Sequence, residues 1–354
     1  MADTHSHSHL WPGVPLALGA AALFGAVSPL SKLLLDEVSP LMLAGVLYLG
    51  AGLGLALFWF YRNSLGESAN EASLQRADVP WLAAAIVMGG IIGPVLLVFG
   101  LVLTTASSAA LLLNVEGLAT VAIAWLVFHE NVDRRILLGA GAMLAGTVVL
   151  SWEGQGVALN GGALLVVGAC IAWGIDNNLT RKISAADPVT TAMLKGLAAG
   201  TANITLALLL GAELPHPAPF WAAAFVGFLG VGVSLVMFIL ALRHLGTART
   251  GAYYSLAPFI GAFLAIVLLG EPVTVRLVLA GILMGVGLWL HLAERHSHVH
   301  EHEALDHGHS HLHDAHHQHT HDGPVTEPHS HPHSHTPMRH SHIHYPDMHH
   351  QHRH

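Results

Sequence analysis

Long apolar runs separated by short polar segments make up most of the chain as far as Ala293. An α-helix rises 1.5 Å per residue, so about 20 apolar residues cross roughly 30 Å of hydrocarbon. Ten runs approach this length: 14–34, 40–61, 79–102, 106–128, 133–152, 161–183, 188–211, 219–242, 247–269 and 273–293. The pattern predicts an all-α integral membrane protein with ten transmembrane helices. A soluble helical protein is disfavoured because it could not bury ten such runs.

The composition agrees with this interpretation. Apolar residues make up 53% of the chain and charged residues only 10%. Mean hydropathy is +0.55, although the segment 296–354 is very polar. The single cysteine, Cys170, excludes an internal disulfide, and we assign it to helix packing.

The apolar part of the chain consists of two similar copies, an internal duplication. Laying the segment 110–152 on the segment 251–293 places Glu130 on Glu271 and Gly146 on Gly287. The earlier part of the chain repeats at a similar separation. Phe24-Gly25 matches Trp173-Gly174, Ser31-Lys32 matches Thr180-Arg181, and Ser39-Pro40 matches Asp187-Pro188. The ten spans therefore divide into five and five, and such repeats in a membrane protein point to a transporter with its site between the repeats.

An odd number of helices in each copy predicts two repeats of opposite orientation. With the N-terminus in the cytoplasm, only Lys32 and Arg276 lie at external ends. The basic residues at cytoplasmic ends are Arg62, Arg76, Arg134, Arg135, Arg181, Lys182, Arg243, Arg249 and Arg295. This positive-inside asymmetry predicts a protein of the plasma (inner) membrane with both termini cytoplasmic. The segment 1–14 lacks a basic n-region, so the first helix is not expected to be a cleaved signal peptide.

We therefore expect four parts: a short His-containing segment 1–13, a first repeat 14–152, a second repeat 153–293, and a disordered His-rich cytoplasmic tail 294–354. The tail has few apolar residues and many prolines, which is typical of disorder.

The two repeats resemble the EamA domains of the drug/metabolite transporter superfamily over about residues 14–293. The resemblance rests on five plus five helices and on short motifs that recur in both copies. The motifs are an acid ending the fourth and ninth spans (Glu130, Glu271) and an aromatic residue eight positions before a basic one (Phe24 and Lys32, Trp173 and Arg181). It implies a secondary transporter of small metabolites, often an exporter, and not an enzyme.

The resemblance also implies an unequal pair of half-sites. Members of the family often carry a Glu-Pro pair midway through the fourth and ninth spans. Here the pair is split, with Glu116-Gly117 in the first copy and Ala257-Pro258 in the second. A symmetric site is therefore not expected.

Glu116 is the strongest candidate for coupling. It is the eleventh residue of the run 106–128, close to the expected midplane, and Asn114 precedes it by two. A charged side chain at mid-bilayer costs about 2.5–3.5 kcal/mol on insertion scales, and desolvation favours a protonated carboxyl group. Glu116 could exchange one proton per cycle, or it could be held permanently by hydrogen bonds between helices.

Further polar candidates lie in the sixth and ninth spans. Asp176 and Asn177 could contact the substrate, or Asp176 could pair with Lys195 of the seventh span. Tyr254 and Ser255 align near the counterpart of Glu116, although an aromatic belt at the membrane interface would also explain Tyr254.

The tail carries 23 of the 30 histidines. Its His-x-His tracts offer neighbouring imidazoles, which suit Zn²⁺, Ni²⁺, Cu²⁺ and Co²⁺. The candidate ligands are His307, His309, His311, His313, His329, His331, His333 and His335. A pH-responsive polycation and low-complexity drift are the alternative interpretations, because free histidine titrates near 6.5.

The pattern leaves three functions open. The core could export a small polar metabolite against protons, with a metal-binding regulatory tail. It could instead move Ni²⁺, Co²⁺, Zn²⁺ or a metal chelate collected by the tail, or act as a non-transporting scaffold or sensor. The spans offer few metal ligands, which favours the first. No cofactor is required. The expected partners are the lipid bilayer, a small-molecule substrate and metal ions; a homodimer is one option, and no nucleic acid is expected.

Overall fold

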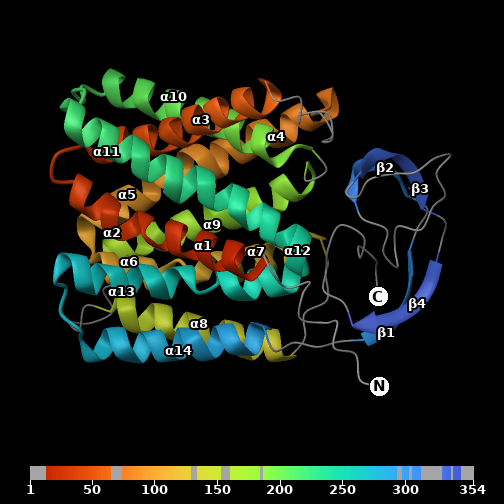
Figure 1. Ribbon diagram of the computed structural model, residues 1–354. Coiled ribbons are helices and arrows are strands. Elements are labelled where there is room, and N and C mark those ends of the chain that lie inside the picture. The colour runs from red at the N-terminus through yellow and green to blue at the C-terminus, as the bar shows by residue number, and fades with distance from the viewer. Residues whose placement is uncertain are drawn as a thin grey trace.

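The computed structural model describes residues 13–64, 74–128, 134–152, 160–183 and 186–292, and four short tail segments, 297–302, 305–311, 329–335 and 338–343. For the tail segments the backbone alone is described. Helices of the two repeats pack side by side in one bundle (Figure 1).

The helical elements of the described residues fall into ten consecutive groups. The first five groups are α1–α2 (Gly13–Gly25, Val27–Leu34), α3 (Pro40–Ser64), η2–α4–η3–α5 (Arg76–Asp78, Val79–Ala85, Ile86–Ile92, Gly93–Leu103), α6–α7 (Ala106–Leu112, Val115–Phe128) and α8 (Arg134–Ser151). The second five are α9 (Gly161–Arg181), α10 (Pro188–Leu209), α11–η4–α12 (Pro217–Gly227, Phe228–Val233, Ser234–Tyr254), α13 (Ala257–Leu269) and α14 (Val275–Leu292).

Each expected span is matched by one of these groups. Seven helical segments of the described chain are long and apolar enough to cross a membrane, and three shorter apolar helices, Leu137–Ser151, Ala257–Leu269 and Val275–Leu290, complete the ten. The all-α membrane fold is thereby confirmed. One boundary differs: α12 runs on to Tyr254, through the loop that we expected between residues 242 and 247. That stretch contains neither proline nor a polar cluster strong enough to end a helix.

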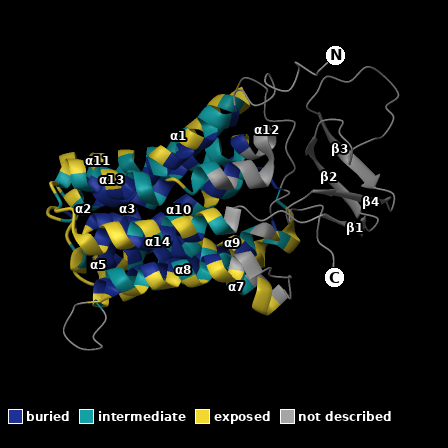
Figure 2. Ribbon diagram, turned by 90° about the horizontal axis from the view of Figure 1, so that it is seen from below, coloured by how far each residue is buried: buried dark blue, intermediate teal, exposed yellow. Residues whose placement is uncertain are grey.

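The outer surface of the bundle is apolar. Large side chains such as Leu57, Leu209 and Trp289 are more than half exposed. Exposed positions follow the outward faces of the helices, while buried positions lie between them (Figure 2). A soluble protein rarely exposes so many apolar side chains, so this surface fits contact with lipid.

Two pairs of helices are related by the duplication. In the contact of α3 with α10, Gly52 lies against the backbone of Leu197, and Gly200 lies against the backbone of Leu49. Gly52 and Gly200 occupy equivalent positions when Ser39-Pro40 is laid on Asp187-Pro188, and so do Leu49 and Leu197. A contact that recurs with its partners exchanged is the mark of a two-fold axis.

The contact of α8 with α14 repeats the relationship. A Cβ atom on Gly146 would lie 2.8 Å from Cγ of Met284, and one on Gly287 would lie 2.8 Å from Cγ of Met143. These glycines and methionines coincide when the segment 110–152 is laid on 251–293. Small residues let membrane helices approach closely. The two repeats therefore pack as inverted copies, as the sequence predicts.

Two of the spans are broken at equivalent places. The fourth is interrupted between α6 and α7 at Leu113 and Asn114. The expected ninth span, 247–269, begins in the last part of α12 and is interrupted between α12 and α13 at Ser255 and Leu256. The same superposition of the repeats lays Asn114 on Ser255. Broken helices at membrane depth are tolerated where they face protein or a cavity, and they often mark the site of a transporter.

At one end of the bundle, a side chain from each repeat forms hydrogen bonds with the backbone of the turn between α5 and α6. The Lys32 ammonium donates hydrogen bonds to the carbonyl oxygens of Leu101 and Thr104. The Glu271 carboxylate accepts from the backbone N–H groups of Ala106 and Ser107, at 2.7 and 2.9 Å. A cation thus caps the C-terminus of α5, and an anion caps the N-terminus of α6, as the helix dipoles favour.

An open pocket of about 910 Å³ lies beside this turn. Lys32, Glu271 and Arg276 line it, so the two basic residues assigned to the external side do share one end of the bundle. The opposite end carries Arg62, which forms an ion pair with Asp187 at 2.9 Å. Helix α1 begins on this side of the bundle, and helix α14 terminates there (Figure 1).

The tail contains strands where we expected disorder. β1 (Ser297–His302) pairs antiparallel with β4 (Met338–Ile343), and β2 (Leu305–His311) pairs antiparallel with β3 (His329–His335). Extended chains can satisfy their backbone groups by pairing even without an apolar core. The all-helical prediction thus holds for the membrane bundle, and the strands follow it in the chain.

The close approach of α3 and α10 generates a prediction. Gly200→Ala places a methyl group against the backbone of Leu49, which cannot move aside as a flexible side chain could. We expect a loss of about 1–3 kcal/mol in stability, as for other overpacked cores. Melting in detergent can be followed with a thiol-reactive dye, because Cys170 is buried and is the only cysteine.

Gly141→Ala is the matched control. A Cβ atom at Gly141 meets nothing within 4 Å, so this change should stay within about 0.5 kcal/mol of the parent. Equal melting of both variants would contradict the proposed packing.

Candidate functional site

Glu116 lies directly after the break in the fourth span. It is the second residue of α7, and its side chain is partly buried. The Asn114 amide in the break donates to the carbonyl oxygen of Leu111 at 2.9 Å. This carbonyl lies in the last turn of α6. Asn114 therefore stabilises the break, and its expected place on the transport pathway stays a prediction.

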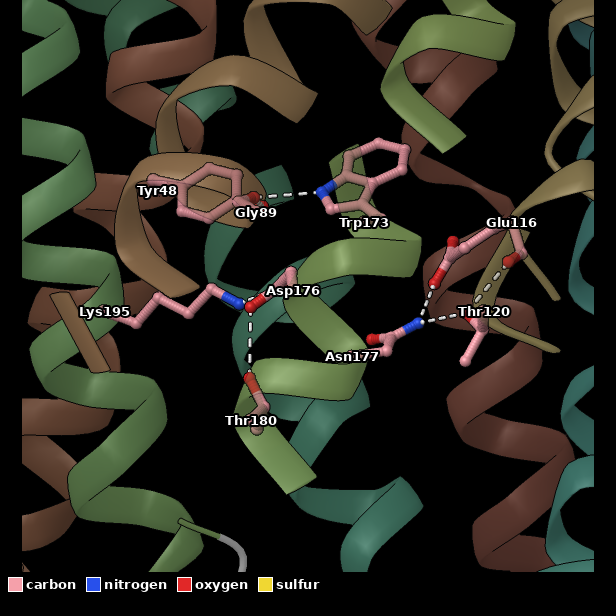
Figure 3. A network of polar contacts seen from close by, with 9 residues as sticks. All are labelled: Tyr48, Gly89, Glu116, Thr120, Trp173, Asp176, Asn177, Thr180 and Lys195. Carbon is pink, nitrogen blue, oxygen red and sulfur yellow. Dashed lines mark hydrogen bonds and ion pairs between the residues drawn. The ribbon is translucent and has the colours of Figure 1, made fainter. Parts of the chain in front are cut away.

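An amide from the second repeat binds the Glu116 carboxylate. Nδ2 of Asn177 on α9 donates to Glu116 Oε1 at 3.0 Å and to Thr120 Oγ1 at 3.1 Å. The Thr120 hydroxyl in turn donates to the Glu116 carbonyl oxygen at 2.9 Å. Figure 3 shows these three residues converging from α7 and α9. The contact joins the two repeats, and among the described residues no ion pair to the Glu116 carboxylate is found.

Asp176 points to the other side of α9. Its carboxylate forms an ion pair with Lys195 of α10 and accepts a hydrogen bond from the Thr180 hydroxyl at 3.1 Å (Figure 3). The exposed fractions of the two charged side chains are 7% for Asp176 and 18% for Lys195. The pairing of Asp176 with Lys195, one of the two alternatives left open by the sequence, is the one that the structure contains.

The third span supplies two carbonyl groups to the same region. Its π-helix η3 releases the carbonyl oxygen of Gly89, which accepts from Tyr48 Oη at 2.8 Å and from Trp173 Nε1 at 2.9 Å. The carbonyl oxygen of Gly90 accepts from Asn203 Nδ2 at 3.0 Å. A side chain at position 89 would collide with the Asp176 carboxylate. Single turns of π-helix are often found at functional sites.

Aromatic rings cover the side of the site that belongs to α12. The Tyr254 ring lies 4.7 Å from that of Phe238 and 5.6 Å from that of Phe24, between ring centroids. These contacts place Tyr254 inside the bundle and argue against the interfacial belt as its role. Ser255 follows it in the break of the ninth span and is partly buried.

The structure thus brings most of the sequence candidates together. Glu116 and Asn177 meet between the repeats, and Asp176, next to Asn177 on α9, pairs with Lys195. Tyr254 packs against Phe24 and Phe238, and Asn114 and Ser255 mark the two helix breaks. Sequence reasoning missed the part played by Tyr48 and Thr120. The Gly89-Gly90 pair in the third span was the available signal, because adjacent glycines leave room for other groups to approach the backbone.

The charged groups of the site are not repeated. The duplication lays Ala257 on Glu116 and Val27 on Asp176. Val27 is buried and Ala257 is fully buried. The unequal half-sites inferred from the split Glu-Pro pair are therefore present in the folded protein.

No group of three or more His, Cys, Asp or Glu side chains that could hold a metal ion occurs among the residues whose side chains the structure describes. In the tail, the register of β2 with β3 pairs His307 with His333, His309 with His331 and His311 with His329. His335 pairs with Leu305, and His313 lies outside the described residues. Metal binding by the tail stays a prediction.

Comparison with known proteins agrees with the duplicated bundle. The model of the EamA-like transporter family matches residues 11–152 and 160–293. A transporter of Methanothermobacter thermautotrophicus, described as uncharacterized, is 29% identical over 298 residues, covering 79% of this chain and 86% of that protein. A probable amino-acid metabolite efflux pump of Salmonella typhimurium is 25% identical over 299 residues, covering 78% of this chain and 93% of the pump.

The fold has also been seen in a crystal. One solved protein structure superposes with a TM-score of 0.58 at 18% identity, covering 79% of this chain and 95% of that one. This likeness concerns the fold alone. With two copies of the family's domain spanning the helical bundle, the chain belongs to the EamA-like transporter family and is a membrane transporter of the drug/metabolite transporter superfamily.

Proposed function

We propose that this transporter exports a small polar metabolite in exchange for protons, with Glu116 as the proton-carrying group. The observation that carries the proposal is the position of this carboxylate, between the repeats and after a broken helix, with a neutral amide as its hydrogen-bond partner. An amide can bind either the carboxylate or the carboxylic acid. Glu116 can therefore take up and lose a proton without dismantling its surroundings.

The remaining polar groups suit a small polar substrate. Asn177 is exposed within the bundle, and the aromatic rings of Phe24, Phe238 and Tyr254 offer an apolar wall nearby. Binding sites of small molecules commonly combine such walls with a few placed polar groups. Similarity to the Salmonella protein described as a probable amino-acid metabolite efflux pump supports both the direction of transport and the class of substrate.

Transport of a transition metal or a metal chelate is the second candidate. The histidines that face each other across β2 and β3 favour metal capture by the tail. The bundle supports the idea less, because the described side chains contain no cluster of metal ligands. We therefore assign metal to regulation by the tail. From the asymmetry of basic residues, we also propose that the tail and the N-terminus lie in the cytoplasm and that the protein belongs to the plasma membrane.

The proton role can be tested with Glu116→Gln. The side chain keeps its volume, so the protein should fold and insert. In proteoliposomes we expect the variant to lose transport driven by a pH gradient and to retain exchange of substrate for substrate, measured with labelled amino acids. Glu213→Gln makes the same change at an exposed position and should behave as the parent. Unchanged gradient dependence in Glu116→Gln would refute the proton role.

The role of the tail can be tested by ending the chain after Arg295. The described helices lose no part, so the shortened protein should insert. Without added metal, metabolite flux should equal that of the full chain, and Ni²⁺ or Zn²⁺ should alter flux only in the full chain. If the core moves metal, the shortened protein should still carry Ni²⁺, with a raised apparent KM because captured ions no longer supply the entrance. Saturable Ni²⁺ flux that depends on Glu116 would thus favour the second candidate.

The orientation can be tested by accessibility labelling. A cysteine at Glu213, in the segment between α10 and α11, should react with a membrane-impermeant maleimide added outside cells. A cysteine introduced into the tail should react only after the membrane is opened. External labelling of the tail would reverse the assigned orientation.

A further inference from the structure

The open pocket beside the turn between α5 and α6 lies where several spans reach the membrane surface. The helices α5 and α8 end beside it, and α9 and α14 begin beside it. Its lining includes Trp152 and Arg276, which are both exposed. Tryptophan and arginine at the ends of spans lie at the depth of the lipid headgroups. The pocket therefore opens at the level where headgroups touch the protein.

The side chains of this pocket carry a net positive charge. Lys32 and Arg276 each contribute one positive charge, and Glu271 contributes one negative charge. Lys32 donates to two backbone carbonyl oxygens, and Arg276 donates to that of Trp152 at 2.8 Å. Among the described residues, neither cation forms an ion pair, and the Glu271 carboxylate is held by two backbone N–H groups. One positive charge is thus left without a partner.

The hydrogen-bonding groups that remain free in the pocket are mainly donors. Oδ1 of Asn160 accepts from the backbone N–H of Ala163, and Oγ1 of Thr274 accepts from that of Leu277, each at 3.1 Å. The Asn160 amide and the Thr274 hydroxyl keep their hydrogens, for which no acceptor occurs among the described residues. The Arg276 guanidinium has about five N–H donors, and its bond to Trp152 uses one of them. Such a set suits an anion with several oxygen atoms better than a zwitterion, whose ammonium group needs free acceptors.

The helices α9 and α14 strengthen this preference for an anion. They are 21 and 18 residues long, and neither has an acidic residue in its first turn. The N-terminus of a long helix carries a partial positive charge, which stabilises a nearby anion. This effect adds to that of the two cationic side chains.

The rim of the pocket is apolar. Leu103, Trp152 and Val275 line it, with exposed fractions of 58%, 51% and 75%. A water-soluble anion would leave these side chains uncovered, whereas the acyl chains of a lipid would lie against them. Burial of apolar surface stabilises such a contact. The rim therefore favours a lipid as the source of the anion.

We propose that this pocket binds the phosphodiester headgroup of an anionic phospholipid such as phosphatidylglycerol. The single negative charge of the headgroup matches the single positive charge of the pocket, and its oxygens accept from Arg276, Asn160 and Thr274. Lys32 belongs to the first repeat and Arg276 to the second, so the bound lipid bridges the two repeats at this end of the bundle. The inference goes beyond the proposed function and does not depend on it.

Native mass spectrometry of the full chain in detergent can test the proposal, because it counts bound lipids and gives their Kd. Measurement without metal at about pH 8 keeps the free histidines of the tail neutral. The intact protein should bind one phosphatidylglycerol about tenfold more tightly than phosphatidylcholine with the same acyl chains, as expected for charge-assisted hydrogen bonds. Glycerophosphoglycerol, which is the same headgroup without acyl chains, should bind more weakly still because the rim stays uncovered.

Substitutions in the pocket should remove this preference. Arg276→Gln should weaken phosphatidylglycerol binding by about tenfold, to the level of phosphatidylcholine, and Arg276→Lys should weaken it less because the charge remains. Val275→Glu adds a negative charge in the first turn of α14, where the helix dipole tolerates it, and should also abolish the preference. Arg76→Gln is the matched control, because it removes an exposed arginine at the start of the third span, at the opposite end of the bundle.

Three outcomes would overturn the inference. They are equal binding of the two lipids by the intact protein, equal effects of Arg276→Gln and Arg76→Gln, and displacement of the lipid by glycerophosphoglycerol or by free amino acids at similar concentration. Displacement of this kind would assign the pocket to a soluble anion or to the exit of the transport pathway. Melting followed at Cys170 shows whether each variant is folded, and Val275→Glu decides the question if Arg276→Gln does not fold.

Discussion

Polar groups inside a hydrocarbon layer must be satisfied by the protein itself, and the architecture of this transporter follows from that requirement. Several places where a helix ladder is interrupted have a side chain that completes it. Tyr48 and Trp173 donate to the carbonyl that the π-helix η3 releases at Gly89. Asn114 donates to the end of α6, and Glu271 accepts from its beginning. Interruptions of this kind are costly in lipid, and partners from neighbouring helices make them tolerable.

The duplication supplies a symmetric scaffold, and the site departs from that symmetry. The contacts of α3 with α10 and of α8 with α14 recur with their partners exchanged, around glycines that permit close approach. The chemistry does not recur, because Ala257 and Val27 stand at the positions equivalent to Glu116 and Asp176. A symmetric frame can rock between two equivalent arrangements, whereas a single set of charges gives the substrate one place to bind. A symmetric movement of the two repeats therefore does not require two equal binding sites.

The tail and the bundle differ in the chemistry they offer to a metal ion. The tail concentrates imidazoles at alternate positions of β2 and β3, while the described part of the bundle offers carboxylates that are already engaged, Asp176 with Lys195 and Glu271 with two backbone N–H groups. A dehydrated divalent ion needs several free ligands at once. The division of labour that we propose, transport in the bundle and metal sensing in the tail, follows from where free ligands are available.

The sequence alone determined the class of fold, the ten spans and their division into two inverted copies, and it singled out Glu116 as the candidate for coupling. These conclusions depend on hydrophobic run length, internal repetition and the cost of a charge in lipid, all of which are local or periodic properties. Side-chain partners were harder to predict. Pairing of Asp176 with Lys195 could be named only as one of two options, and the hydrogen bond by which Asn114 closes a helix break was not foreseen.

Only the tertiary structure decided which faces of α7, α9 and α10 meet, and hence that Asn177 turns to Glu116 while its neighbour Asp176 turns to Lys195. Consecutive residues of a helix point about 100° apart, so the rotation of α9 fixes both contacts together. That rotation is set by packing against α5 and α7, including the fit of Gly174 against Ala119. A linear sequence specifies the order of polar residues along a helix, but the direction each one faces depends on neighbours that are distant in the chain.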